Sequence, residues 1–555
     1  MSRIPYFLVF LFLTEFAISQ NLTVLDGNNV ETIIGTNGTM WWDYNDAYYR
    51  VNGEKVDRLF SGGIWVGGID EMNQLKVAAQ TYRQSGDDFW PGPIENAQED
   101  PQAAETEDWD RHWKINKSEI LELNAKPKPI PLDEIPEAIL TWPAKGNPFA
   151  MGYRDAPLEI NKEIAPFIDM DSDGVYRADL GDIPDIPGDQ ALFWVFNDMY
   201  DKHTSSGGES LNIEIKAFAY ACAGSAPIGE TTFYRYILTH YGDTRLDSMH
   251  FANFTDVDLG SFDDDFVACD TIRNLGIGYN GKAFDGPAIA DFGDRPPTIA
   301  VDILRGFGKS NLDRKTRRNM SYFMYYDGDF SVTGNPRTPL DHFRYMSGYW
   351  KNNAHWTYGG NGYGGAIETN YMFPSPPSEP LPAWSECSEG NTPFDRRFLM
   401  SSGPFSMEPG VSDTIDIAVV TADAIGPQMG CQADFSRLNS ASDYVQSYYE
   451  AYILSGIYKN GLTANRWEPE IIEITSMSIN PNPTRAGSLI SWPQAIHSDK
   501  IQISIYNLDG KLMFRTPYLA ENQFIIEAWF MSPGLYLVSL EDYGHRINSI
   551  KWTTY

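Results

Sequence analysis

The chain has 555 residues, of which 42% are hydrophobic and 14% aromatic, enough to build large cores in about two to four domains. Its formal net charge of −33 excludes non-specific binding to nucleic acid and to anionic membranes. Such a charge suits a protein of the cation-rich exterior.

The first twenty residues are typical of a secretory signal peptide. Arg3 precedes a short apolar run at residues 6–13, and Ala17 and Ser19 place small residues at the cleavage spacing. The run is too short to cross a bilayer. We therefore predict a signal peptide at residues 1–20 and a mature chain that is not an integral membrane protein.

The next stretch favours β structure. Runs at residues 60–68 and 75–82 flank a polar turn at residues 70–74, which predicts a hairpin of two strands. Residues 95–165 contain acidic clusters and a proline-rich string. We expect extended covering segments there, with a few helical turns at most.

An acidic loop at residues 169–182 offers the oxygen ligands that calcium prefers. Asp169, Asp171 and Asp173 occupy positions 1, 3 and 5 of a D-x-D-x-D-G string. Leu180 stands at position 12, where such loops usually carry a glutamate, so a later aspartate has to replace it. The alternative is a solvated acidic turn. The predicted ligands of a structural calcium ion are Asp169, Asp171, Asp173, Val175 (through its carbonyl), Asp179 and Asp182.

A second acidic string follows at residues 256–265. Its aspartates alternate and cluster, which suits a cation but defines no register. The alternative is an exposed loop of a very acidic protein. The candidate ligands of this weaker site are Asp256, Asp258, Asp263 and Asp265.

Alternation of apolar and polar residues predicts further strands, and one long helix follows them. The helix, at residues 433–458, has an aromatic stripe at helical spacing, which indicates a docking face rather than a cofactor site. The strands close an all-β domain. They are expected at residues 192–196, 211–220, 233–239, 397–405 and 414–421.

Residues 360–365 contain a G-x-G-x-x-G string. A dinucleotide site needs a helix directly after this string, and the prolines at residues 374–377 forbid one. We therefore expect a surface loop without a nucleotide.

The four cysteines are expected to form disulfides, because an exported chain with an even cysteine count favours them. Three pairings are possible. We favour the pairs nearest in sequence, Cys222 with Cys269 and Cys387 with Cys431. The alternative is four buried thiols.

A linker at residues 461–470 leads to a small domain at residues 471–555. Short strands with polar turns, including the Asp509–Gly510 hairpin turn, indicate a sandwich. The sequence as a whole predicts a mainly β fold. A large β-rich body at residues 21–460, with long loops and one late helix, precedes a small C-terminal Ig-like β-sandwich.

Three strings mark this last domain: Pro-Asn-Pro-Thr at 481–484, Tyr-Asn-Leu-Asp-Gly-Lys at 506–511 and Gly-Leu-Tyr-Leu-Val at 534–538. On these strings the domain resembles the type A C-terminal sorting domain of type IX secretion cargo from Bacteroidota. The chain departs from that pattern after Lys551, where it is slightly longer. The resemblance implies Sec export, folding in the periplasm, and outer-membrane passage through the type IX secretion machinery, directed by residues 471–555. The product is then secreted or held at the cell surface.

The body, residues 21–460, is similar to a group of uncharacterised exported proteins from the same bacteria. This resemblance places the protein without assigning an activity to it. The shared strings lie at residues 63–68, 78–84, 88–93, 188–191 and 402–405.

Three function classes remain open. The first is a calcium-stabilised secreted or surface protein for adhesion, binding or assembly. The second is an extracellular polysaccharide-acting enzyme, a glycoside hydrolase or lyase, which needs two carboxylates across a cleft. The third is a carbohydrate-binding protein with Trp65, Trp90 or Trp350 as stacking planes, although large aromatics mostly serve core packing. The chain has no G-x-S-x-G or H-E-x-x-H string, so we favour the first class.

Overall fold

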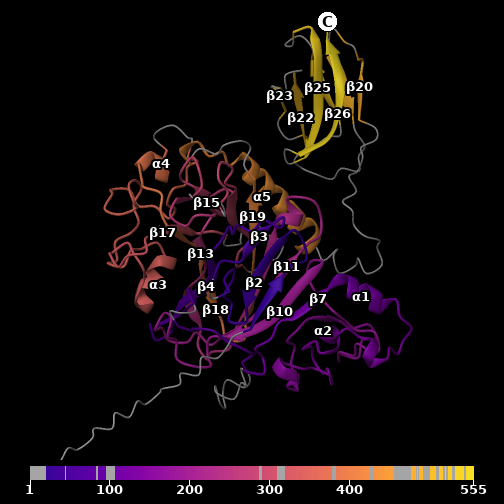
Figure 1. Ribbon diagram of the computed structural model, residues 1–555, viewed down its shortest axis with the longest axis vertical. Coiled ribbons are helices and arrows are strands. Elements are labelled where there is room, and N and C mark those ends of the chain that lie inside the picture. The colour runs from indigo at the N-terminus through magenta and orange to yellow at the C-terminus, as the bar shows by residue number, and fades with distance from the viewer. Residues whose placement is uncertain are drawn as a thin grey trace, which may run out of the picture.

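The computed structural model describes a β-rich body and a C-terminal group of strands (Figure 1). The predicted signal peptide at residues 1–20 and the linker at residues 461–470 lie outside the described residues. In the body the described residues are 21–43, 46–82, 86–94, 107–286, 291–308, 319–377, 383–423 and 430–454, and in the C-terminal part they are 477–482, 484, 487–491, 501–507, 512–516, 519, 523–527, 532–542 and 545–554.

One layer of the body is a five-stranded antiparallel sheet in the order β17-β18-β13-β4-β5. The predicted hairpin is confirmed as β4 and β5. A Cβ on Gly62 of β4 would lie 2.5 Å from the Trp41 ring, so glycine is what lets this ring pack on the strand. The strands are β17 (Tyr322–Tyr326), β18 (Arg396–Met407), β13 (Leu246–Val257), β4 (Ser61–Asp70) and β5 (Leu75–Ala79), beside a small sheet of β1 (Leu22–Leu25), β2 (Val30–Gly35) and β3 (Tyr49–Val51).

The second layer is a nine-stranded antiparallel sheet in the order β14-β15-β16-β19-β12-β11-β10-β6, with β7 also pairing with β10. Four of the predicted strands are confirmed here, and the fifth is β18 of the other sheet. The strands are β14 (Asp265–Asp270), β15 (Leu275–Asn280), β16 (Thr298–Arg305), β19 (Ser412–Ala422), β12 (Thr232–His240), β11 (Ile213–Ala221), β10 (Gln190–Asn197), β6 (Trp90–Pro91) and β7 (Trp113–Asn116).

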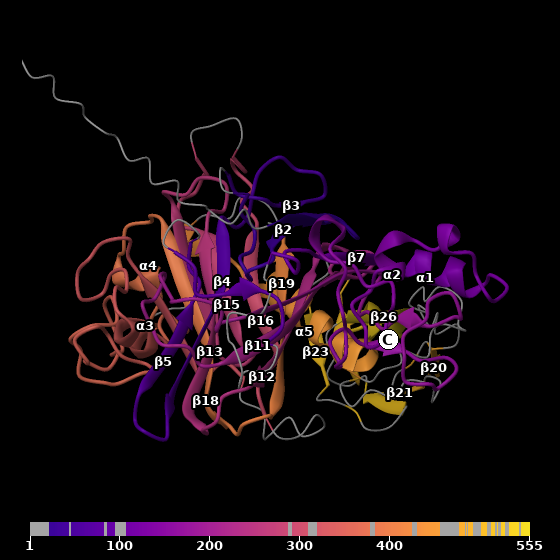
Figure 2. The ribbon, with the colours of Figure 1, turned by 90° about the horizontal axis from the view of Figure 1, so that it is seen from below.

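Both faces of the nine-stranded sheet are buried. In β10, Trp194 and Phe196 belong to the core shared with the five-stranded sheet, whereas Phe193 and Val195 belong to a second core on the opposite face. Successive side chains of a strand point to opposite faces, so this alternation requires a third layer. Figure 2 shows the strands in the middle of the body, with α3 and α4 on one side and α1 and α2 on the other.

The third layer consists of residues 107–112, residues 117–186 and the late helix. That helix is confirmed as α5 (Ser436–Tyr448), which continues into a π-helical turn at Tyr449–Leu454. The Tyr449 hydroxyl donates a 2.5 Å hydrogen bond to the buried carboxylate of Asp416 in β19, so the aromatic face of the helix packs on the nine-stranded sheet. The other short elements are α1 (Lys117–Asn124), α2 (Glu137–Leu140), α3 (Pro339–Met346), α4 (Glu386–Glu389), β8 (Phe167–Ile168), β9 (Ile183–Pro184) and 3-10 turns at Leu132–Glu134, Tyr153–Asp155, Ile228–Glu230 and Gly430–Gln432.

The C-terminal strands form two small sheets around a core of their own, which confirms a β-sandwich. Ile505, Val538 and Trp552 are fully buried in that core. The three-stranded sheet contains β20 (Ser478–Asn480), β21 (Gly487–Ser491) and β24 (Gln523–Glu527), and the four-stranded sheet contains β23 (Leu512–Arg515), β22 (Ile501–Tyr506), β25 (Gly534–Asp542) and β26 (His545–Thr554).

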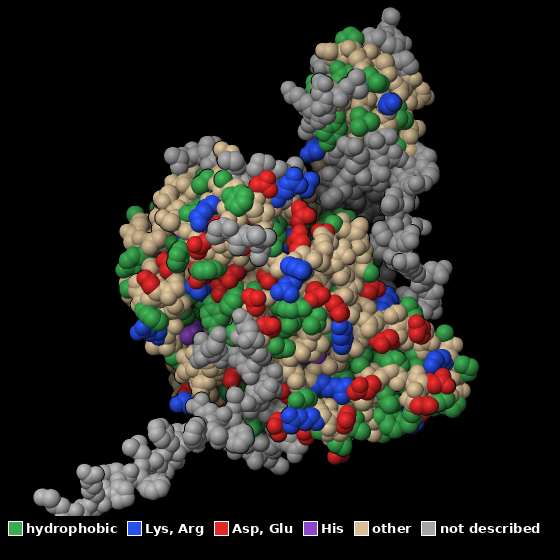
Figure 3. Space-filling model, in the orientation of Figure 1, with side chains coloured by type: hydrophobic (Ala, Val, Ile, Leu, Met, Phe, Trp, Pro, Cys, Tyr) green, Lys and Arg blue, Asp and Glu red, His purple; other side chains and the backbone are tan. Residues whose placement is uncertain are grey.

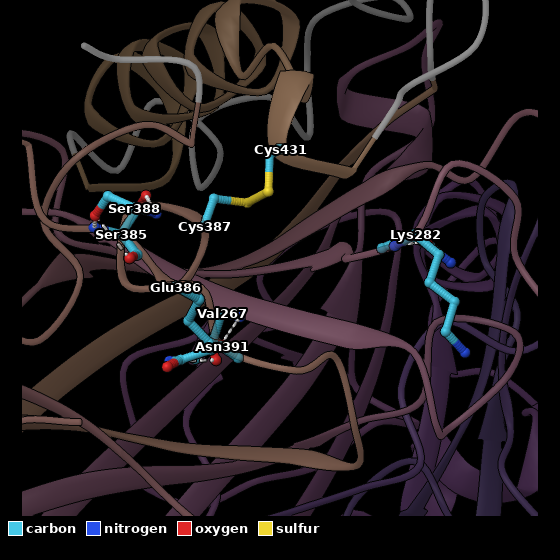
Figure 4. Close-up of a disulfide and its surroundings, with 9 residues drawn as sticks. Val267, Lys282, Ser385, Glu386, Cys387, Ser388, Asn391 and Cys431 are labelled. Carbon is cyan, nitrogen blue, oxygen red and sulfur yellow. Dashed lines mark hydrogen bonds between the residues drawn. A yellow bond between two sulfur atoms is a disulfide. The ribbon is translucent and has the colours of Figure 1, made fainter. Parts of the chain in front are cut away.

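One of the two favoured disulfides is present. Cys387 of α4 is bonded to Cys431, which lies in the 3-10 turn before α5 (Figure 4). The prediction of a Cys222–Cys269 disulfide is wrong, because both thiols are free and buried. Four strands separate β11 from β14, or about 24 Å at the usual strand spacing, and the two thiols face opposite sides of the sheet.

The G-x-G-x-x-G segment is confirmed as a loop. Residues 358–365 form turns, and no helix follows them among the described residues up to 377.

Candidate metal centres

The first acidic loop lies between the paired strands β8 and β9 in the third layer. Asp169, Asp171 and Asp173 each offer one ligand atom, and these atoms all lie within 4.8 Å of one another. Two oxygens bound to one calcium ion at about 2.4 Å can be at most about 4.8 Å apart. The three carboxylates that the spacing predicted therefore do share a focus.

Main-chain donors already hold this loop in shape. Asp169 accepts hydrogen bonds from the N–H groups of Ser172 (2.7 Å) and Gly174 (2.8 Å), and Asp173 accepts one from Val175 (2.8 Å). The Gly174 N–H is the main cause of the lowered pKa of Asp169. Gly174 itself has a φ of +80°, which glycine adopts without strain.

The later aspartates of the loop do not join this focus. Asp179 forms a salt bridge with Arg177 at 2.7 Å, which lowers the pKa of Asp179. Asp182 is buried, and its two oxygens accept the N–H groups of Met170 and Arg177 at 2.8 and 2.7 Å. Asp182 thus fixes the base of the loop rather than replacing the missing glutamate.

The second acidic string is only partly brought together. One carboxylate oxygen from each of Asp256, Asp258 and Asp395 lies within 4.8 Å of the other two. Asp395 was not among the ligands predicted from the sequence. Asp263 is exposed and contacts the Ser261 hydroxyl and Lys282. Asp265 is buried and accepts the Leu259 N–H at 3.1 Å. Asp263 and Asp265 are therefore not part of the group that could share an ion.

This Asp256 cluster lies where β13 ends and β18 begins. The register places Asp256 opposite Arg397, and Asp258 and Asp395 flank the paired strand ends. The Tyr82 hydroxyl donates to Asp256 Oδ2, Arg397 Nε donates to the Tyr82 oxygen at 2.5 Å, and Arg397 donates to Asp395 Oδ2 at 2.7 Å. Two strands and the segment after β5 thus converge on one buried polar group.

Burial dominates the electrostatics of the Asp256 cluster. It raises the pKa of Asp256 to about 7 and that of Asp258 well above its usual value, with the neighbouring carboxylates adding to the effect. Burial also raises the pKa of the Tyr82 phenol. Perturbed groups of this kind are common at functional sites.

The sequence analysis did not predict that Tyr82, Asp395 and Arg397 belong to this cluster. Asp395 directly precedes β18 and Arg397 is its second residue, and only the β13–β18 register brings them to Asp256. The local signal was the Asp-Arg-Arg string at residues 395–397 directly before an apolar strand, since charges at a strand start need partners.

The tryptophans proposed as sugar platforms are in the core. Trp65, Trp90 and Trp350 are 0%, 6% and 1% exposed, so the stacking prediction is wrong for all three. Two polar hollows of about 550 and 310 Å³ occur elsewhere, the larger along β1 to β3 and the smaller beside Arg111 and Arg154, and no tryptophan lines either. Acidic and basic side chains are interspersed over the face shown in Figure 3.

Within the described residues, every helix is too short or too polar to cross a membrane.

A family model described as the secretion system C-terminal sorting domain matches residues 478–551. The chain thus ends in a type IX secretion sorting signal, carried by the C-terminal sandwich, and this supports export to the cell surface or the extracellular space. Such a tail implies contact with the type IX secretion machinery. No curated protein matches the chain.

Among solved structures, a polysaccharide lyase is similar with a TM-score of 0.19 and 8% identity, over 70% of this chain and 38% of that one. The chain thus spans well under half the length of the lyase. A biofilm-associated protein BSP domain gives a TM-score of 0.15 at 8% identity, over 96% and 80% of the two chains. Carbohydrate-binding and INT domains of Clostridium perfringens ZmpB, in complex with GlcNAc, give 0.11 at 9% identity, over 65% and 95%. At these TM-scores none of the three carries an argument.

Proposed function

We propose that this chain is a type IX secretion cargo that works outside the cell in adhesion, binding or assembly, with a body stabilised by calcium. The match of residues 478–551 to the sorting domain supports the export part of this proposal. The route is Sec export of residues 21–555 followed by passage across the outer membrane. The kinship of residues 21–460 with other exported proteins remains a prediction.

The export route has a direct test. A chain without residues 471–555 should accumulate inside the cell envelope, whereas the full chain appears outside. The matched control is a fluorescent protein that carries residues 1–20 and 471–555, which should also appear outside. Normal export of the truncated chain would refute the sorting role.

Calcium at the 169–173 loop is supported by three carboxylates with a shared focus and a loop shape already fixed by main-chain donors. An ion bound to the folded chain at one hundred times its Kd adds about 2.7 kcal/mol of stability. Calcium should therefore raise the melting temperature, and EGTA should reverse this. Asp171→Asn should remove this loop's share of the gain, whereas Asp133→Asn, at an exposed site elsewhere in the third layer, should keep it. A gain unchanged by Asp171→Asn would refute calcium at this loop.

A binding role is supported by large apolar side chains exposed on loops of the body. Five of the large apolar side chains exposed in the described part of the body lie in the loops at residues 327–338 and 355–368, and a monomer rarely exposes several together without a use for them. A glycan array and a turnover screen on polysaccharides separate the alternatives. Glycan capture without turnover supports binding, and turnover supports the enzyme class. The exposed side chains are Phe330, Val332, Tyr358, Tyr363 and Ile367.

A further inference from the structure

We infer a second calcium site at the Asp256 cluster, formed by carboxylate oxygens of Asp256, Asp258 and Asp395 and oriented by Tyr82 and Arg397. The site lies at the junction of β13 with β18, and it is independent of the loop at residues 169–173.

Unused acceptor atoms are the first argument. Asp256 is 3% exposed, and its Oδ2 is occupied by the Tyr82 hydroxyl while its buried Oδ1 accepts no hydrogen bond from any described residue. Asp395 repeats this arrangement, because Arg397 occupies its Oδ2 and leaves its buried Oδ1 without a donor. Leaving a buried carboxylate oxygen without a partner is unfavourable, so two such oxygens on neighbouring carboxylates need a common partner.

Charge is the second argument. The nearest cation to Asp256 Oδ1 is the Arg397 Nε, at 3.6 Å, and this nitrogen already donates to Tyr82. Asp258 forms no hydrogen bond or salt bridge within the described part of the chain. When all three carboxylates are ionised, as binding of an ion requires, one guanidinium faces three negative charges, and the uncompensated charge equals that of one divalent cation.

The ligand chemistry selects the ion. All candidate ligands are carboxylate oxygens, without a histidine or cysteine in the group, which favours a hard cation. The oxygens come from two strand ends rather than from a rigid octahedral cage, and calcium tolerates such irregular geometry better than magnesium. Water can complete the shell on the side of Asp258, which is partly exposed.

The structure supplies both a test variant and a matched control. Asp258→Asn removes one ligand charge at a partly exposed position and keeps the side-chain shape, so the chain should still fold. Asp263→Asn makes the same change five residues later, at an exposed aspartate that contacts the Ser261 hydroxyl and Lys282. Asp395→Asn is a second test from the other strand, in case folding tolerates Asp258→Asn poorly.

The measurement is the number of calcium ions bound per purified full chain, by equilibrium dialysis with calcium alone. The wild type and Asp263→Asn should bind two ions, Asp258→Asn and Asp395→Asn one, and Asp171→Asn one. Loss of an ion in Asp171→Asn only would overturn the second site. Loss in Asp258→Asn and Asp395→Asn but not in Asp171→Asn would support this site and refute calcium at the first loop.

Discussion

His203 is expected to act as a buried cation that stabilises the body below neutral pH. Its Nδ1 lies 2.7 Å from the Val77 carbonyl oxygen and its Nε2 lies 2.7 Å from the Asp198 carbonyl oxygen. Carbonyl oxygens only accept, so both ring nitrogens carry hydrogen and the imidazole is charged. Burial opposes this charge, but the carboxylates of Asp198 and Asp88, at 3.8 and 3.9 Å, outweigh it and raise the pKa of His203.

Replacing His203 with glutamine removes the only cation within 4 Å of either buried carboxylate among the described residues. Breaking a buried ion pair costs about 3–5 kcal/mol, and the long N–O distances favour the lower end. With an unfolding entropy of about 2.1 cal/mol/K per residue, a body of about 440 residues loses roughly 3 °C in melting temperature for 3 kcal/mol.

The sign of the pH dependence follows from the raised pKa. The contribution of His203 is fully present below about pH 6.5, the unperturbed value, and it is lost as the pH rises through the higher folded value. Burial raises the pKa of Asp302 to about 8, so its contribution to the stability of the folded chain also falls with rising pH. The informative quantity is therefore the difference in melting temperature between wild type and His203→Gln at each pH.

Thermal melts of the full chain, followed by tryptophan fluorescence across this pH range, provide the assay. The difference in melting temperature should be largest at acidic pH and shrink as the pH rises. The control is His355→Gln, because that ring contacts a single carbonyl, of Trp356, at 3.0 Å. A difference that stays constant with pH would refute the doubly protonated ring.

Three more predictions concern the third layer and its anchors. Relative to wild type, Asp302→Asn should gain melting temperature as the pH rises from about 4 to about 8 and keep that gain at higher pH, because burial disfavours the charged Asp302 in the folded chain, as measured by paired melts against pH. Replacing Cys387 and Cys431 with serine should cost about 4 kcal/mol for a closed loop of 44 residues, and a reductant should lower the melting temperature of the wild type but not of the variant. Tyr449→Phe should cost about 2 kcal/mol, because it removes a hydrogen bond to the buried Asp416 carboxylate, and proteolysis at the late helix should become faster.

Local pattern was enough to predict the strands and the first acidic loop. The hairpin of β4 and β5 follows from apolar runs around a polar turn, and β10 to β12 follow from alternation and composition. The focus of Asp169, Asp171 and Asp173 follows from a spacing of two residues, which depends on the loop alone.

Contacts between segments distant in sequence could not be predicted from local sequence pattern. Asp395 meets Asp256 only through the β13–β18 register. The sandwich of two sheets was also hidden, since β18 and β19 follow each other in the chain yet belong to different sheets. Each of these outcomes depends on strand order, which no single segment encodes.

The nine-stranded sheet has a consequence for oxidation during export. An exported chain enters an oxidising compartment while its four cysteines are still thiols. As long as the chain is unfolded there, any two of them can form a wrong disulfide. Once the sheet has formed, it insulates Cys222 on one side and Cys269 on the other, and only Cys387 and Cys431 remain neighbours. If the body folds before its thiols are oxidised, the Cys387–Cys431 disulfide therefore forms without any need to isomerise wrong disulfides.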